Sequence, residues 1–156
     1  MIATSETIQR LVLHEGCRLQ PYRCSAGYLT IGVGRNLDAN PLTPAELKVC
    51  GDWRHGITKN AAFCLLKNDI ERAVKDCERY IPFFGNLDAE RQYALVDMCF
   101  NLGVSGLLKF KKMLSAMGVG NYIEAAAECL SSSYARQTGK RAQRIAILIK
   151  TGEWLV

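Results

Sequence analysis

Residues 14–36 read HEGCRLQPYRCSAGYLTIGVGRN, and this stretch passes from helical to extended character within a few positions. The residues before it, 4–14, repeat apolar side chains three and four positions apart, which predicts a helix that Gly16 ends. From residue 17 onward, glycines and a proline alternate with β-branched and aromatic residues, which predicts an antiparallel hairpin or a three-stranded sheet. Because so small a sheet is not stable alone, it must pack against helices.

The rest of the chain has a helical pattern. Thr43 can cap a short helix whose start is Pro44, and Glu46 completes a capping box. One apolar stripe over residues 58–81 predicts a long helix. Further helices are expected over about 88–102, 122–131 and 141–150. The sequence therefore predicts an α+β fold, mostly helical with one small sheet near the N-terminus.

Length and composition limit the classes of protein that this chain fits. Its 156 residues suit one domain with a sizeable core, and its net charge is +5. No apolar run approaches the roughly 20 residues of a membrane span, and no signal peptide is recognisable at the N-terminus. The positive charge suits an acidic partner such as nucleic acid, an anionic membrane face or the bacterial wall, although an ordinary solvated surface gives the same pattern.

The seven cysteines are an odd number without a signal peptide, which indicates synthesis in a reducing compartment. Four of them fall on apolar faces of helical patterns and are interpreted as buried thiols that pack as small hydrophobic residues: Cys64, Cys77, Cys99 and Cys129. No pair of Cys or His residues has zinc-ligand spacing apart from His14-x-x-Cys17, which we regard as accidental. Neither a metal site nor a cofactor is predicted.

The opening stretch resembles the phage lysozyme (endolysin) family, glycoside hydrolase family 24. The family pattern is a Glu, eight residues, an Asp or Cys, five residues and a Thr, which here falls on Glu15, Cys24 and Thr30. Weaker matches follow in family order over nearly the whole chain: Thr30-Ile31-Gly32-Val33-Gly34, Leu87-Asp88-Ala89-x-Arg91, Phe100-Asn101-x-Gly103, Gln137-Thr138, Lys140-Arg141-Ala142-x-Arg144 and Thr151-Gly152-x-Trp154. Their order and spacing together make the resemblance specific.

The resemblance implies a fold and an activity. The fold is a single lysozyme-like domain over residues 1–156, with a β lobe over about 16–57 and a helical lobe over about 1–15 and 82–156. A linking helix over about 58–81 joins them, and the cleft lies between the lobes. The implied activity is hydrolysis of the β-1,4 bond between N-acetylmuramic acid and N-acetylglucosamine in bacterial peptidoglycan, which lyses the host cell.

Glycoside hydrolysis needs an acid for the leaving oxygen and a second group on the other face of the sugar. Glu15 is the only Asp or Glu in the stretch and is the predicted general acid. Burial would keep it protonated, whereas Arg141, which the resemblance places nearby, would favour its ionised form or hold it in position. Cys24 stands where many family members have Asp. Its thiolate could activate a water that Thr30 positions, could attack carbon directly, or could be a passive packing thiol.

Other residues are predicted to position or bind the substrate. Arg35 follows the glycine turn at a place where a His is common in the family. Asn101, Gln137 and Thr138 are candidate sugar or peptide contacts, although ordinary polar residues on helices would look the same.

A second cysteine, Cys17, lies two residues after the acid, and a turn after Gly16 could bring it to Cys24. The resulting disulfide would block Cys24. Some family members hold an active-site cysteine in this general way and are tethered by an N-terminal signal anchor, which is not seen here. Either such an anchor was removed, or the enzyme waits in the host cytoplasm for a holin pore. In both cases we expect synthesis in the host cytoplasm and action on the wall in the periplasm, as a monomer.

Two other readings stay open at the level of sequence. In the first, a cysteine hydrolase would use Cys24 as nucleophile and His14 or His55 as base, and would cut amide bonds in the wall. In the second, a non-catalytic module would bind the wall or nucleic acid through two basic clusters, Lys109, Lys111 and Lys112 and Lys140, Arg141 and Arg144. Aromatic residues are not interleaved with those clusters, so nucleic-acid binding is not predicted.

Overall fold

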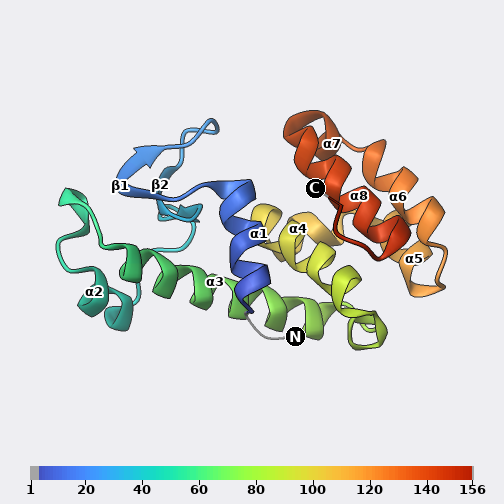
Figure 1. Ribbon diagram of the computed structural model, residues 1–156, viewed down its shortest axis with the longest axis horizontal. Helices are drawn as coiled ribbons and strands as arrows, with labels where there is room; N and C mark the ends of the chain where they lie inside the picture. Colours follow the sequence, from blue (N-terminus) through green and yellow to red (C-terminus); the bar gives the residue numbers. More distant parts are fainter. Residues whose placement is uncertain (1–3, 156) are drawn as a thin grey trace. The chain divides into compact units, whose positions relative to one another are not determined.

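The computed structural model describes residues 4–155, and Figure 1 traces them from the N-terminus in blue to the C-terminus in red. The chain divides into two compact units after Arg72. The division falls inside the long helix α3 (Lys59–Tyr80), which matches the helix predicted over 58–81. The first helix groups with the N-terminal unit, whereas the resemblance had assigned residues 1–15 to the helical lobe.

The N-terminal unit begins with α1 (Ser5–Glu15), which Thr4 caps by accepting a hydrogen bond from the Thr7 N–H. Three antiparallel strands follow in the order β1-β2-β3. Their bounds are Arg18–Arg23, Leu29–Gly32 and Arg35–Asn36. The pairing of β1 with β2 is irregular between Arg18 and Tyr22. The predicted small sheet is therefore confirmed.

The sheet packs on helices, as its size requires. The helix α2 (Pro44–Cys50) starts with the predicted capping box between Thr43 and Glu46, and a 3-10 turn, η1 (Trp53–His55), follows it. Apolar side chains from the sheet, α2 and the first turns of α3 share one core cluster: Ile31, Leu37, Cys50, Ile57, Ala61, Ala62 and Leu65. This core fixes the sheet against α3 within the N-terminal unit.

The C-terminal unit is all helical in its described residues, apart from short connections. After the end of α3 its elements are η2 (Phe84–Asn86), α4 (Ala89–Leu108), α5 (Lys111–Gly118), α6 (Tyr122–Leu130), α7 (Ser133–Thr138) and α8 (Lys140–Thr151). The middle of α4 is fully buried from Tyr93 to Cys99. Arg91 ties α4 to α8, because its Nε donates to the carbonyl of Ile149 at 2.7 Å.

The α+β class is confirmed, and most helix bounds agree with the predictions within two residues. The helix predicted to end at about residue 102 has non-helical backbone at Gly103 and then continues to Leu108. Among the described residues, no single helix has the length and hydropathy of a membrane span, although the bent pair α4 and α5 meets both criteria together.

Candidate active site

Glu15 is the last residue of α1, and the helix end holds it beside the sheet. Gly16 ends the helix with φ of 72°, and its N–H donates to the carbonyl of Val12 at 2.8 Å. The half-buried side chain of Glu15 lies against the turn between β2 and β3, because a Cβ added to Gly34 would stand 2.6 Å from its Oε2. The predicted acid therefore lies where α1 meets the sheet.

Cys24 follows β1 directly and opens the turn into β2. Its N–H donates to the carbonyl of Tyr28 at 3.0 Å, and its own carbonyl accepts from the Gly27 N–H at 2.8 Å. This tight turn folds the chain around the half-buried sulfur. Thr30, one residue into β2, is 4% exposed and points its hydroxyl into the same turn, where it donates to the carbonyl of Tyr28 at 2.9 Å.

The turn makes Cys24 more acidic than an ordinary thiol. Burial alone would raise its pKa, but the N–H groups of Tyr28, Ala26 and Gly27 and the hydroxyl of Thr30 hydrogen-bond to the sulfur and lower the pKa below its usual value. The Thr30 hydroxyl has one proton, so it can donate it to the Tyr28 carbonyl or turn it toward a Cys24 thiolate. This arrangement favours the ionised form of Cys24, the form needed in a base or nucleophile.

Tyr22 brings Glu15 and Cys24 into one electrostatic neighbourhood. The pKa of its phenol is raised by burial first and then by the charge of Glu15, with smaller contributions from Cys24 and Cys17, while Arg18 lowers it. The Arg18 guanidinium lies 4.0 Å from the centroid of the Tyr22 ring. Sequence reasoning assigned Tyr22 no role, although alternation along β1 already puts it on the same side as Cys24, two residues later.

Cys17 and Cys24 are free thiols that stand beyond opposite ends of β1. Arg18 lies opposite Gly32 and Arg23 lies opposite Leu29. Those three steps along β2 cover about 10 Å, and the cysteines lie one residue further out at each end. Since a disulfide needs Cα atoms closer than about 7 Å, the predicted Cys17–Cys24 bond would require β1 to leave β2. The fold as it stands does not support that lock.

Arg35 occupies a buried ion cluster rather than an exposed binding position. Its guanidinium is 3% exposed and makes a two-pronged contact with Glu46, at 2.7 Å and 3.0 Å, and a further ion pair with Asp69 at 3.2 Å. Its Nε donates to the carbonyl of Asn40 at 2.9 Å. Because these contacts occupy the head group, the structure does not support the predicted substrate contact, and Arg35 instead joins β3 to α2 and α3.

The remaining predicted residues lie in the C-terminal unit. Arg141, at the start of α8, donates from Nε to the buried carboxylate of Asp97 at 2.8 Å, and Asp97 also accepts from the Tyr93 hydroxyl at 2.7 Å. Asn101 is exposed on α4. The hydroxyl of Thr138 donates to the carbonyl of Tyr134 at the end of α7, so it serves the helix locally.

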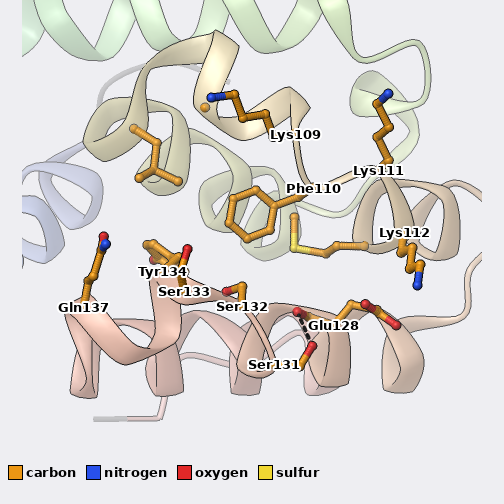
Figure 2. A pocket seen from close by; sticks show the side chains of 13 residues that line it. Lys109, Phe110, Lys111, Lys112, Glu128, Ser131, Ser132, Ser133, Tyr134 and Gln137 are labelled. Atoms are coloured by element: carbon orange, nitrogen blue, oxygen red, sulfur yellow. Dashed lines mark hydrogen bonds between the residues drawn. The ribbon is translucent and has the colours of Figure 1, made fainter.

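Gln137 lines a pocket of about 590 Å³ within the C-terminal unit, shown in Figure 2. The end of α4 and the start of α5 form one wall, and α6 and α7 form the other. Phe110 and Tyr134 meet edge to face across it with ring centroids 5.8 Å apart. Lysines 109, 111 and 112 contribute positive charge along the first wall, and sequence reasoning had noted them only as a basic cluster. The pocket suits a ligand with both apolar and anionic parts.

The histidines give the cysteine-hydrolase reading no support. The side chain of His55 is 84% exposed and lies 3.4 Å from Asp52 in the η1 turn. His14 lies in the last turn of α1. Among the described groups that chiefly set the pKa of Cys24, backbone N–H groups and the Thr30 hydroxyl appear and no histidine does.

Comparison with known proteins shows which family the chain resembles. The family model "Phage lysozyme" matches residues 12–150. "Probable T4-type lysozyme 2" from Dictyostelium discoideum is 30% identical over 152 residues, which cover 88% of this chain and 89% of that protein. An "Endolysin" from Acyrthosiphon pisum secondary endosymbiont phage 1 is 31% identical over 131 residues, or 82% of this chain and 77% of that protein.

A further relative is much longer than this chain. "Pre-baseplate central spike protein Gp5" from Enterobacteria phage T4 is 32% identical over 151 residues, which cover 88% of this chain but 26% of that protein. The same sequence region therefore occurs both in proteins of similar length and as part of a larger one. With a family model that matches residues 12–150 and a relative that is 30% identical and covered to 89%, the chain belongs to the phage lysozyme family.

Proposed function

We propose that this phage-type lysozyme hydrolyses the β-1,4 bond between N-acetylmuramic acid and N-acetylglucosamine in bacterial peptidoglycan, as an endolysin. Family membership and the endolysin relative support the class of activity. The observation that carries the proposal is local: the Glu15 carboxyl group lies against Gly34, in the turn after β2, and Thr30 of β2 lies in the turn that holds the Cys24 thiol.

In the proposed reaction, Glu15 gives its proton to the glycosidic oxygen as the bond to the sugar carbon breaks. A water then forms the new bond to that carbon and loses its proton to the Cys24 thiolate. Thr30 orients the water or the thiolate through its hydroxyl. Solvent restores both groups, because Glu15 takes up a proton and Cys24 releases one. No redox partner or cofactor enters this scheme.

The pocket beside Gln137, within the C-terminal unit, is a second candidate binding site. We infer that it receives a sugar or peptide portion of peptidoglycan, since Phe110 offers apolar surface and the lysines attract carboxylates. Release through a holin, action in the periplasm and a monomeric state belong to the same proposal, and they rest on the resemblance to endolysins.

The test is loss of turbidity of outer-membrane-permeabilised Gram-negative cells by wild type and Glu15→Gln. Glu6→Gln is a matched control, because Glu6 is an exposed carboxylate in the first turn of the same helix. We expect Glu15→Gln to lose activity and Glu6→Gln to keep it. Product analysis should find new reducing ends on N-acetylmuramic acid. New amino groups without new reducing ends would instead identify an amidase and overturn the proposal.

A further inference from the structure

The glycine at position 34 faces the proposed acid. Gly34 lies in the turn between β2 and β3 with φ of +68°. A Cβ built there would stand 2.6 Å from Oε2, 2.8 Å from Cδ and 3.1 Å from Cγ of Glu15. Contacts below 3.0 Å are essentially never seen for a Cβ, so the bare α-carbon is what leaves room for the carboxyl group.

Backbone conformation alone does not set Gly34 apart. Gly32 has φ of +67° and Gly51 has φ of +63°, so all three positions favour glycine for the same reason. A Cβ on Gly32 would make an ordinary 3.5 Å contact with the Cβ of Ala62, and one on Gly51 would meet nothing within 4 Å. Alanine at Gly32 or Gly51 would therefore strain the backbone as alanine at Gly34 does, but without crowding Glu15.

We infer that Gly34 is a positioning residue for the general acid. The Glu15 carboxyl group packs against the α-carbon of Gly34, and this contact determines its position. The inference rests on the proposed function. Glu15 ends α1, so its backbone is held by the helix. Because Cγ, Cδ and Oε2 would all be crowded, rotation of the carboxyl group alone cannot relieve the contact. The side chain must therefore shift from its place, and the shift carries the acidic proton away from the glycosidic oxygen.

Loss of position is expected to act on the chemical step. A displacement of about 1 Å in a reacting group can cost about 100-fold in rate. Substrate binding draws on contacts along the sugar and peptide chain, so the KM should change far less than the kcat. A merely structural role would instead lower activity only in proportion to the fraction of unfolded protein.

The experiment compares Gly34→Ala with Gly32→Ala and Gly51→Ala. The kcat and KM are measured on soluble peptidoglycan oligosaccharides, and stability is measured by urea unfolding. We expect all three variants to be destabilised, and only Gly34→Ala to lose about 100-fold in kcat, with KM within about twofold of wild type. A kcat for Gly34→Ala within about threefold of that for Gly32→Ala would overturn the inference.

A double-mutant cycle keeps the inference testable if Gly34→Ala folds poorly. Glu15→Ala removes all three crowded atoms, so Gly34→Ala should cost less stability in that background than in wild type, or should regain folding there. Additive costs, or a double variant that still fails to fold, would show that the contact is not the cause.

A Glu15→Gln arm separates the two proposals. If Glu15→Gln is inactive and Gly34→Ala is fully active, the acid role stands and the positioning role of Gly34 fails. If Glu15→Gln is active, the acid role fails, and the positioning role fails with it.

Discussion

The hydroxyl of Thr30 donates to the carbonyl of Tyr28 at 2.9 Å, which places it in the turn that holds Cys24, where it lowers the pKa of the Cys24 thiol. The hydroxyl has one proton, so it turns from the Tyr28 carbonyl to the sulfur when Cys24 becomes a thiolate. Three backbone N–H groups complete the shell around the sulfur. This shell is prepared for a negative charge, which is what a base facing a glycosidic carbon requires.

Thr30→Val should therefore raise the pKa of the Cys24 thiol, because it removes a hydrogen bond to the thiolate and keeps the shape of the side chain. The measurement is the rate of alkylation by iodoacetamide against pH, read at Cys24 by peptide mass spectrometry. The half-buried Cys17 in the same sample serves as an internal control. An unchanged alkylation profile at Cys24 would mean that the backbone N–H groups alone set its acidity.

Cys24→Ala should lower the kcat by about 100- to 10,000-fold, the usual contribution of a positioned acid or base. Cys24→Asp should retain most of the activity, because a carboxylate can accept the same N–H and hydroxyl donors. The kcat is read from the release of reducing ends, and Cys17→Ala is the matched control. If Cys24→Ala were as active as wild type, the thiol would be passive and Glu15 would act without it.

Mild oxidation of the folded protein should leave Cys17 and Cys24 unjoined. The pairing of β1 with β2 holds their Cα atoms well beyond the roughly 7 Å that a disulfide spans. The same oxidant in partly denaturing urea should allow the bond, because β1 is then free to leave the sheet. Peptide mass spectrometry reads the linkage. A Cys17–Cys24 linkage formed in native buffer, with activity restored by reductant, would show that β1 can unpair and would revive the redox lock.

Sequence signals located the elements whose causes are local. The start of α2 was predicted to the residue, because Thr43 and Glu46 act on each other within one turn. The helix α7 was missed, since Ser133–Thr138 is too short to show an apolar period.

Some residues of the candidate site were likewise predicted from the sequence, and others were not. The resemblance found Glu15, Cys24 and Thr30 by spacing, but Arg35 was assigned to substrate because its partners lie on α2 and α3. Gly34 looked like an ordinary turn glycine until the structure placed Glu15 against it. The roles of Arg35 and Gly34 therefore depend on contacts between elements distant in sequence, which the local sequence does not reveal.

The Arg35–Glu46 pair should make stability depend on pH. Hydrogen bonding to Arg35 outweighs burial and lowers the pKa of Glu46 to about 2, from 4.5 when unpaired. A carboxylate with a lowered pKa stabilises the fold above its unfolded pKa, and that contribution is lost as the pH falls from 4.5 toward 2. Burial raises the pKa of neighbouring Asp69, so Asp69 gives stability the opposite dependence on pH. This contribution cancels when wild type is compared with a variant of Glu46, because both contain Asp69.

Glu46→Gln should accordingly cost about 3 kcal/mol in the free energy of unfolding at pH 7, because it leaves the buried Arg35 with one fewer counter-charge. At pH 2.5 the cost should shrink, since the wild-type Glu46 carboxyl is then almost fully protonated in the unfolded state and about a quarter protonated in the folded state. Urea unfolding at the two pH values gives the difference, and Glu71→Gln, on the exposed side of α3, is the control. A cost that is equal at both pH values would mean that Glu46 acts through its shape and neutral hydrogen bonds, and that its charge adds no stability.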